Sequence, residues 1–328
     1  MSQEAAQAAI RRFRQLTLVV WGDMVADEFL DGEIVRVSRE APVLILKQRR
    51  RALAAGGGAN AALNLAALGV RVRLVGVVGE DEAGERLRQI FIQAGIGIDG
   101  LRRLAGRPTP TKTRILAHHP HTAPQQVVRL DHEPSRLAAS EQARLARAAA
   151  RALRGAHGLL LSDYGYGAVT PALAARLRSP LTSVDARFDI GAYRGMSAAT
   201  PNEPELEAAL NVDIATSSDP AAALERAGRL LLRRLRCRHL LVTRGRDGLA
   251  LLEPGRRTLH WPVFGPQQAV DVTGAGDTVI AVFTAALAAG ADGPTATVLA
   301  NCAGGLVVMK PGTATVSAAE LTAAVAQC

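Results

Sequence analysis

Cysteine is scarce in this sequence. The 328 residues include three cysteines, Cys237, Cys302 and Cys328, which are widely spaced and odd in number. This usage excludes a disulfide framework and a cysteine-based metal cluster. We therefore expect a protein of a reducing compartment, the cytoplasm.

Long apolar runs are also missing. No run approaches the roughly 18 residues of a membrane span, and the apolar stretch 16–20 is too short for the core of a secretory signal. The composition, 48% hydrophobic and 21% charged, excludes disorder and collagen. The length is ample for a sizeable hydrophobic core, and we expect no association with a membrane.

Aromatic residues make up only 3% of the chain, whereas its net charge is +9. The positive charge is almost wholly arginine, because the only lysines are Lys47, Lys112 and Lys310. Base stacking needs aromatic side chains among the basic ones, so we expect no nucleic-acid partner. Many arginines fall in helical stretches such as 141–155, and we interpret most of them as parts of solvated helix faces. A site for a small phosphorylated anion is the other use of such charge.

The hydrophobic pattern predicts an α/β fold. Apolar strands alternate with helices, which indicates a mostly parallel sheet covered on both faces. Half-exposed strands at 34–37, 43–48, 112–118 and 126–131 do not fit this sheet and predict a small, separate antiparallel sheet. The main-sheet strands are predicted at 17–21, 72–78, 158–162, 181–185, 239–243, 249–252 and 258–262. Helices are predicted at 59–68, 82–94, 140–154, 171–178, 220–235, 276–289, 294–308 and 318–326.

The octapeptide 271–278, Asp-Val-Thr-Gly-Ala-Gly-Asp-Thr, opens one of these helices. Small residues at a helix start leave backbone N–H groups bare, and the helix dipole favours a phosphate there. A carboxylate in that turn would repel the anion, so Asp277 needs a function of its own. Accepting the proton of a hydroxyl that attacks a phosphate is such a function. The alternative is an ordinary Gly-rich turn in which Asp277 caps the helix.

Three further motifs accompany the octapeptide. Segment 56–60 reads Gly-Gly-Gly-Ala-Asn, segment 200–205 reads Thr-Pro-Asn-Glu-Pro-Glu, and segment 243–245 reads Thr-Arg-Gly, with Gly248 just beyond. No Gly-Lys-Ser/Thr of a Walker loop occurs. In type and order the four motifs resemble the signatures of the ribokinase-like (PfkB) carbohydrate kinases, and the resemblance covers nearly the whole chain.

This resemblance implies a three-layer α/β/α fold with a mostly parallel central sheet and a small β-sheet lid. The lid would comprise segments of about 31–50 and 108–132, inserted in a single kinase domain that spans 1–328. Bifunctional members of the family join the kinase to a nucleotidyltransferase. We expect the kinase alone, because its pattern runs from Val19 to Val316.

Within the family the chain is most similar to the heptose-7-phosphate kinases. The resemblance is carried by 22–27, 38–43, 60–64, 129–131, 161–165 and 310–316. It implies transfer of the γ-phosphate of ATP to the C1 hydroxyl of D-glycero-D-manno-heptose 7-phosphate, a precursor of lipopolysaccharide. The chain departs from the subgroup at 185–188, Asp-Ala-Arg-Phe in place of Asp-Pro-Lys-Gly, and at Arg39 in place of Pro. A kinase of ribose, fructose or another sugar phosphate is the alternative.

The resemblance also implies residue roles. Asp277 would be the catalytic base, and the N–H groups of Gly274, Ala275 and Gly276 would stabilise the transferred phosphoryl group. The nucleotide would lie along Asn202, Glu205, Thr243, Gly245, Gly248 and Asn301. Glu205 would hold Mg²⁺ through water. The alternative for Asn202 and Glu205 is a capping box at a helix start, and Asn301 could equally be a satisfied helix residue.

On the sugar side, Asp23, Asp27 and Asn60 would bind hydroxyls, and Gly57 and Gly58 would let the backbone approach the sugar. The alternative for both aspartates is a turn or cap. The predicted small sheet carries cations that would clamp the 7-phosphate, namely Lys112, Arg114 and Arg129, together with Arg36 and Arg39. The alternative for each is a solvated basic face.

Three smaller expectations complete the prediction. Asp271 and Thr273, with the Gly312 loop, mark the place where many family members hold a monovalent cation, K⁺. The small sheet would leave edges that a second copy of the chain could cover, which favours a homodimer. His118, His119 and His121 look like a metal cluster by count, but Pro120 and the absence of nearby cysteine argue against one.

Two other classes of protein fit these residues less well. A dinucleotide-binding dehydrogenase would need its glycines directly after the first strand, and here further strands come before segment 56–58. A sugar-binding protein without activity would not need Asp277. The residues therefore favour a kinase.

Overall fold

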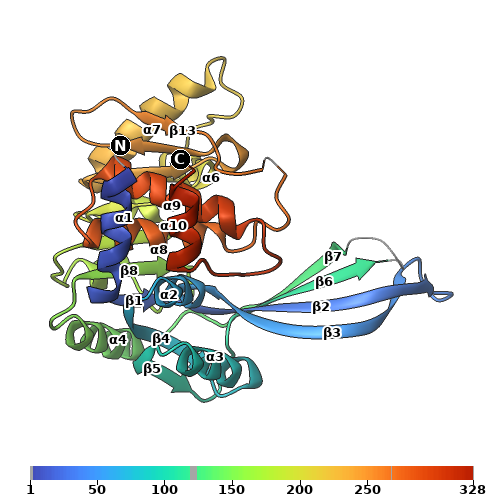
Figure 1. The fold of residues 1–328 in the computed structure, drawn as a ribbon. Coiled ribbons are helices and arrows are strands. Elements are labelled where there is room, and N and C mark those ends of the chain that lie inside the picture. Colours follow the sequence, from blue (N-terminus) through green and yellow to red (C-terminus); the bar gives the residue numbers. More distant parts are fainter. Residues whose placement is uncertain (1–2, 119–123, 267, 328) are drawn as a thin grey trace.

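Two β-sheets organise the chain in the computed structural model, which describes residues 3–118, 124–266 and 268–327. Figure 1 shows the larger sheet inside a layered body and the smaller sheet projecting from it. In the larger sheet the strands lie in the order β13-β12-β11-β10-β9-β8-β1-β4-β5. The pairs from β5 across to β11 are parallel, and the two at the β13 edge are antiparallel. The predicted α/β class is confirmed.

The strands of the larger sheet have the following bounds: β1 Thr17–Gly22, β4 Arg71–Gly79, β5 Gly97–Leu104, β8 Gly158–Asp163, β9 Thr182–Ala186, β10 Ala198–Ala199, β11 His239–Thr243, β12 Leu249–Leu252 and β13 Leu259–Trp261.

Alternating side chains of the central strands build a core on each side of this sheet. In β1, Leu18 and Val20 join one buried cluster, whereas Val19 and Trp21 join the other. The helices on the first side are α1 Gln3–Arg12, α2 Gly58–Ala67, α3 Glu82–Gln93, α8 Ala275–Ala288, α9 Gly293–Val307 and α10 Ala318–Val325. Those on the second side are α4 Ala139–Ala152, α5 Pro171–Ala174, α6 Glu203–Leu210 and α7 Pro220–Leu235. The result is the predicted three-layer α/β/α arrangement.

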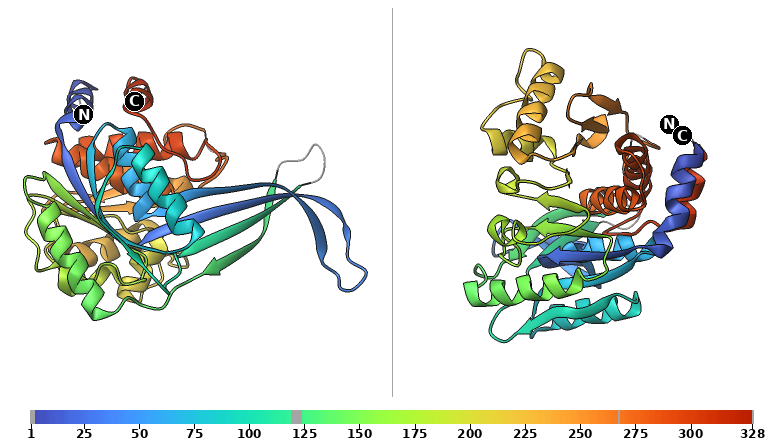
Figure 2. Two further views of the ribbon diagram at one scale, coloured as in Figure 1. Left: turned by 90° about the horizontal axis from the view of Figure 1, so that it is seen from below. Right: turned by 90° about the vertical axis from the view of Figure 1, so that its left-hand side faces the viewer.

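Helix α8 is apolar on every face, as a helix buried on all sides must be. Its residues from Asp277 to Ala286 are buried, and it packs between α2 and α9. Helices α1 and α10 lie side by side, which brings the two described ends of the chain together (Figure 2).

The smaller sheet, called the lid below, is built by β2 Met24–Val37, β3 Leu44–Gly57, β6 Thr111–His118 and β7 Gln125–His132. Its order is β3-β2-β6-β7. The prediction of an antiparallel sheet is corrected, because β2 and β6 pair in parallel at its centre. The long connection through the larger sheet between β3 and β6 permits this parallel pair.

Some elements differ from the prediction. The lid strands β2 and β3 are much longer than 34–37 and 43–48, and β2 begins just after β1. Helix α1 and strands β5 and β10 were not predicted. The helix expected at 171–178 ends at Ala174, because Ala174 is its only buried residue and Pro180 disfavours helical backbone before it.

This fold gathers functional side chains at one edge of the larger sheet. Strands β1, β8, β9 and β11 all end there, because they are parallel. The carboxyl edge of an open α/β sheet is where ligands bind. None of the helices in the described ranges is both long enough and apolar enough to cross a membrane.

Candidate active site

Two cavities meet at the start of helix α8. The smaller, about 150 Å³, lies between the lid and the turn 272–277. The larger, about 550 Å³, borders the same turn. Val272, Ala275 and Gly276 line both cavities. Two reactants can therefore reach the same turn, one from each cavity.

The turn depends on Gly274. This residue has a φ of +77°, and a Cβ there would come within 2.4 Å of the Asn60 side-chain nitrogen. Both the dihedral angle and the space require glycine. The N–H of Ala275 donates to the Val272 carbonyl at 3.3 Å, whereas the N–H groups of Gly276 and Asp277 have no backbone acceptor among the described residues. These bare donors, at the positive end of the helix dipole, suit an anion.

The Asp277 carboxylate is buried and held at both oxygens. Its residue is 4% exposed. The Asn60 side-chain N–H donates to Oδ2 at 3.1 Å, and the Tyr164 hydroxyl donates to Oδ1 at 2.9 Å. Burial raises the pKa of Asp277 to about 7, assisted by the charge of Asp27 and opposed by these two hydrogen bonds and Lys112. A carboxylate with a pKa near 7 can both accept and release a proton near neutral pH.

The lid supplies the other wall of the smaller cavity, through Asp27, Gly57, Lys112 and Arg114. Arg114 pairs with Asp27. Lys112 is 7% exposed, and no carboxylate of a described residue lies within ion-pair distance of it. Burial, together with nearby Arg187, lowers the pKa of Lys112. The cavity thus contains a buried ammonium group without an acidic partner, and this group suits an anionic ligand.

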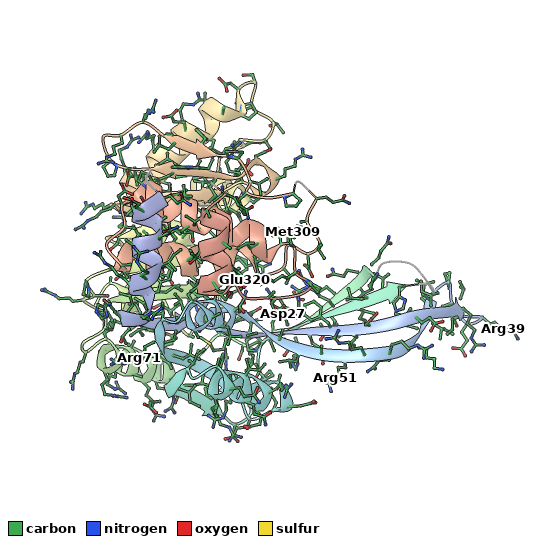
Figure 3. All side chains as sticks on the ribbon, in the orientation of Figure 1. Asp27, Arg39, Arg51, Arg71, Met309 and Glu320 are labelled. Atoms are coloured by element: carbon green, nitrogen blue, oxygen red, sulfur yellow. The ribbon has the colours of Figure 1, made fainter. Side chains whose placement is uncertain are left out.

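The other predicted lid cations lie away from this cavity. Arg129 binds Asp131 at 2.8 Å and has a side chain that is 41% exposed. Arg36 is near the far end of β2, and Arg39 is at the tip of the lid, whereas Asp27 is at its base (Figure 3). Only Lys112 and Arg114 are brought to the cavity.

Asp23 lies beneath the cavity rather than in its wall. Its carboxylate accepts the backbone N–H groups of Tyr164 at 2.9 Å, Tyr166 at 3.1 Å and Ala168 at 2.9 Å. Burial raises its pKa to about 6 against these hydrogen bonds. Gly58 donates its N–H to the Asp23 carbonyl at 3.1 Å. Sugar binding by Asp23 and Gly58 stays a prediction, and their contacts are those of residues that hold loops in place.

The larger cavity is lined mostly by backbone and aliphatic groups. The predicted nucleotide-side residues Asn202, Thr243, Gly245, Gly248 and Asn301 all line it. The Asn301 side-chain N–H donates to the Pro262 carbonyl at 2.8 Å, which leaves its oxygen for a ligand. A largely apolar cavity with polar groups at a few positions suits a nucleobase.

Asn202 and Glu205 form the capping box that the sequence offered as an alternative. The Asn202 side chain accepts the Glu205 N–H at 2.7 Å, and the Glu205 carboxylate accepts the Asn202 N–H at 2.9 Å. Burial raises the pKa of Glu205, and burial with the charges of Glu205 and Asp277 raises the pKa of Asp185. Asp185 therefore interacts with both Glu205 and Asp277. The oxygens of Asp185 and Glu205 fit a hydrated divalent cation, which needs few direct protein ligands.

Asp271 joins two loops. Its carboxylate accepts the N–H of Thr273 at 2.9 Å and that of Gly312 at 2.9 Å. The buried hydroxyl of neighbouring Thr313 has no hydrogen-bond partner among the described residues. An unpartnered oxygen at this junction fits an oxygen-coordinated cation.

Of the three histidines singled out in the sequence, His118 belongs to the described residues. His118 lies 3.3 Å from Asp31, whereas His119 and His121 lie outside the described residues. In the described ranges, no group of three His, Cys, Asp or Glu side chains could hold a metal ion.

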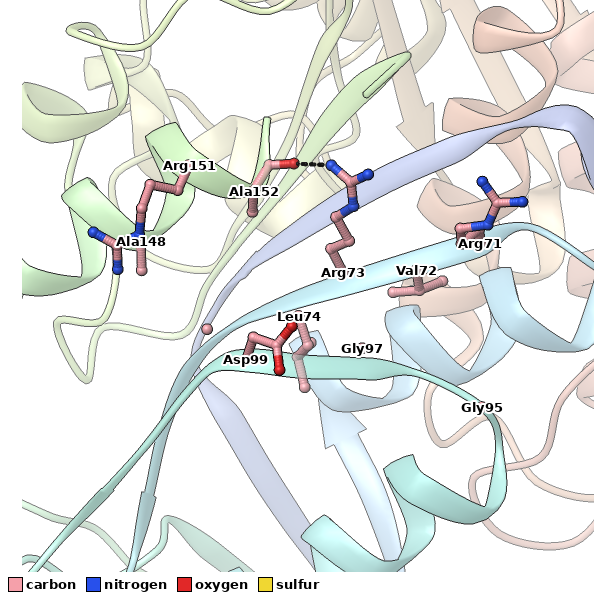
Figure 4. Close-up of a pocket in the computed structure, with 11 residues that line it drawn as sticks. Arg71, Val72, Arg73, Leu74, Gly95, Gly97, Asp99, Ala148, Arg151 and Ala152 are labelled. Carbon is pink, nitrogen blue, oxygen red and sulfur yellow. Dashed lines mark hydrogen bonds between the residues drawn. The ribbon is translucent and has the colours of Figure 1, made fainter. Parts of the chain in front are cut away.

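A further cavity of about 520 Å³ lies between α4 and strands β4 and β5. Arg71, Arg73, Arg151 and Asp99 line it, and none of the predicted site residues does. Figure 4 shows that the three guanidinium groups do not converge on one point, and Arg73 donates to the Ala152 carbonyl at 2.7 Å. This cavity is separate from the site at α8.

Comparison with known proteins decides the family. The model of the pfkB family of carbohydrate kinases matches residues 16–320. The chain belongs to this family. The predicted family and its class of enzyme, a carbohydrate kinase, are thereby confirmed.

Relatives of this pfkB kinase cover almost all of it. The bifunctional protein HldE of Azotobacter vinelandii is 42% identical over 319 residues, 96% of this chain and 64% of the relative. The bifunctional protein HldE of Hahella chejuensis is 42% identical over 326 residues, 98% of this chain and 66% of the relative. The chain therefore spans about two thirds of the length of these relatives.

Solved structures share the fold of this pfkB kinase. Arabidopsis thaliana ribokinase, in complex with ribose and ATP, is 20% identical and has a TM-score of 0.70 over 94% of this chain and 98% of its own. Escherichia coli phosphofructokinase-2, with substrates and products, is 18% identical and has a TM-score of 0.76 over 95% and 98%. The predicted ribokinase-like fold is confirmed.

Sequence reasoning on this pfkB kinase assigned no role to Tyr164, which contacts Asp277 directly. A signal existed, since Tyr164 follows the buried strand β8 at the carboxyl edge of the sheet, where ligand-binding groups gather. The sequence could not predict that the Tyr164 hydroxyl contacts Asp277, because 113 residues separate the two.

Proposed function

We propose that this chain transfers the γ-phosphate of ATP to the C1 hydroxyl of D-glycero-D-manno-heptose 7-phosphate. One observation carries the proposal. The buried Asp277 carboxylate lies at a turn shared by two cavities, and the smaller cavity contains the buried cation Lys112, which has no acidic side chain within ion-pair distance in the described ranges. The similarity to the HldE relatives supports a heptose phosphate as the acceptor.

In this proposal the sugar occupies the smaller cavity and its hydroxyl faces Asp277. The carboxylate takes the hydroxyl proton as the oxygen attacks the γ-phosphorus, and ADP leaves on the side of the larger cavity. The bare N–H groups of Gly276 and Asp277, with the α8 dipole, stabilise the charge on the transferred group. Lys112 and Arg114 bind the 7-phosphate, and Asp27, Gly57 and Asn60 lie beside the sugar.

The cations are part of this proposal. Glu205 and Asp185 would hold hydrated Mg²⁺, which when bound neutralises charge on the triphosphate. Asp271, Thr273 and the 312–313 loop would hold K⁺ and so fix the turn before α8. ATP as phosphate donor supports a cytoplasmic location.

We also propose a homodimer formed through the lid. Apolar lid side chains are 43–63% exposed, namely Val35, Val37, Val43, Leu44, Val127, Val128 and Leu130. The outer strands β3 and β7 present uncovered edges, and a second copy of the sheet could cover both kinds of surface. Sedimentation velocity over a concentration series tests this, and a single monomeric species at every concentration would exclude the dimer.

The proposed base makes activity depend on pH. Asp277 must be ionised to accept a proton, and its pKa is about 7. We expect kcat/KM to fall as the pH decreases through about 7, because protonated Asp277 cannot act as a base. Activity that stays constant down to the ordinary carboxyl range, near pH 4, would contradict the assignment.

The decisive experiment measures ADP release with each of four acceptors: heptose 7-phosphate, unphosphorylated heptose, ribose and fructose. We expect kcat/KM for heptose 7-phosphate to exceed that for free heptose by on the order of 100-fold, the value of a buried charge pair. Product analysis by ³¹P NMR then locates the new phosphate. Equal kcat/KM values for the two heptoses would contradict the proposed binding site for the 7-phosphate. A clear preference for ribose or fructose would identify that sugar as the acceptor.

A further inference from the structure

Tyr164 contacts the Asp277 carboxylate and also lines the smaller cavity. Its hydroxyl donates a 2.9 Å hydrogen bond to Oδ1 of Asp277, and its ring forms part of the wall of the smaller cavity. Asn60 donates to the other carboxylate oxygen. The two donors come from different elements, so together they fix the plane of the carboxylate. A carboxylate has about four acceptor positions, and the rest stay available to a substrate hydroxyl.

Tyr164 is itself held in place from several sides. The Asp23 carboxylate accepts its backbone N–H at 2.9 Å. The Lys112 ammonium lies 5.0 Å from the centre of its ring. Gly57, at a φ of +56°, leaves room for the ring, since a Cβ on Gly57 would come within 3.0 Å of the ring carbon Cε2. The hydroxyl is therefore directed at Asp277 by contacts from both the body and the lid.

We propose that Tyr164 is a positioning residue for phosphate transfer: its hydroxyl holds the Asp277 carboxylate toward the acceptor hydroxyl and favours the ionised base. The inference rests on the function proposed above. Tyr164 does not exchange the proton itself, because burial and the charge of Asp277 raise its pKa well above the ordinary value.

Removing the hydroxyl should change the pH dependence in one direction. The charged and titratable groups that face Asp277 are Asp27 from β2, Lys112 from β6, Tyr164 from the loop after β8 and Asp185 from β9. The Tyr164 hydrogen bond favours the ionised form of Asp277. Without it the pKa of Asp277 rises, and the acidic limb of kcat/KM moves to higher pH.

The test is Tyr164→Phe, which keeps the ring and removes only the hydroxyl. We expect kcat to fall on the order of 10- to 100-fold, the range of a hydrogen bond to a charged group. The KM for ATP should stay the same, and the acidic limb of kcat/KM for heptose 7-phosphate should move to higher pH. A merely structural role would not move this limb. The ionisation of the substrate phosphate is the same for both enzymes and cancels in the comparison.

Tyr166→Phe is the matched control. It removes a phenol hydroxyl from the same loop, but that hydroxyl donates to Glu133 at 2.8 Å and not to Asp277. We expect its kcat and its acidic limb to match the wild type. An unmoved limb and a kcat within about twofold of wild type in Tyr164→Phe would overturn the positioning role, since a lost charged hydrogen bond costs more than this.

Asp277→Asn in the same series separates the two proposals. If Asp277→Asn is inactive and Tyr164→Phe behaves as wild type, the base assignment stands and the role of Tyr164 fails. If Asp277→Asn retains turnover, the base assignment fails, and the role of Tyr164 fails with it.

Discussion

Asp277→Asn is expected to lower kcat for phosphate transfer about 1000-fold, within the range that a general base contributes. Asparagine has nearly the same shape but cannot accept the proton of the acceptor hydroxyl. The larger cavity is unchanged, so ATP should bind with wild-type affinity or better, because a negative charge near the triphosphate is gone. ADP release measures the first effect, and titration calorimetry measures the second.

Asp277→Asn lowers activity, but it should increase the stability of the folded protein. Burial raises the pKa of Asp277 to about 7, above its value of 3.8 in an unfolded chain. The ionised side chain therefore destabilises the fold, and this cost grows as the pH rises from about 3.8 to about 7 and stays at its full value above that. We expect Asp277→Asn to melt at a higher temperature than wild type at pH above 7.

The control for this variant is Asp292→Asn. Asp292 also lies at a helix start, where its side chain accepts the Thr295 N–H at 2.8 Å, but it belongs to α9 and lines neither cavity at α8. Asparagine is an equally good cap, so activity and stability should stay near wild type. Near-normal turnover in Asp277→Asn would show that another group accepts the proton.

Lys112→Met should reduce the preference for a phosphorylated sugar. Lys112 is buried and forms no ion pair with a carboxylate of the described residues, and in the proposed complex it contacts the 7-phosphate. We expect kcat/KM for heptose 7-phosphate to fall on the order of 100-fold. The value for free heptose should fall much less. Because both acceptors use the same base, the ratio of the two values isolates the contact with the phosphate.

Lys47→Met is the matched control, since Lys47 is an exposed lysine on lid strand β3. It should leave the kcat/KM values for both heptoses unchanged.

Methionine at position 112 removes a desolvated charge, so Lys112→Met should be at least as stable as wild type. An equal loss with both heptoses would show that Lys112 acts on the transferred phosphate or on Asp277 and not on the 7-phosphate.

Local signals explain which parts of the fold were predictable. Helix α7 was predicted to the residue, because Asp219 caps its start and Pro220 occupies the first turn, while a 3.6-residue apolar pattern runs through to Leu235. The lid strands were underestimated. Their inner halves, such as Met24–Ala26 in β2, are buried like a main-sheet strand, whereas the outer halves are exposed. A single strand that passes from the core into solvent has no uniform hydrophobic pattern from which its length can be predicted.

The part of the candidate site that lies within one short segment could be predicted from sequence. The composition of the turn at 271–278 is enough to single out Asp277, and residues 274–277 all line the smaller cavity. Their roles in the reaction stay predictions. The sequence could not show which lid cations reach the smaller cavity. The alternation of side chains along a strand does not indicate how far a residue lies from the larger sheet. Arg114 and Arg129 are direct neighbours across β6 and β7, yet only Arg114 reaches the cavity.

The turn shared by the two cavities has a consequence for inhibition. Val272, Ala275 and Gly276 contact both spaces, so a single molecule could fill them together by passing directly over this turn. An adenosine polyphosphate joined to a sugar phosphate has the required order of groups. Such a bisubstrate compound loses its translational and rotational freedom once rather than twice, and it should bind far more tightly than either half.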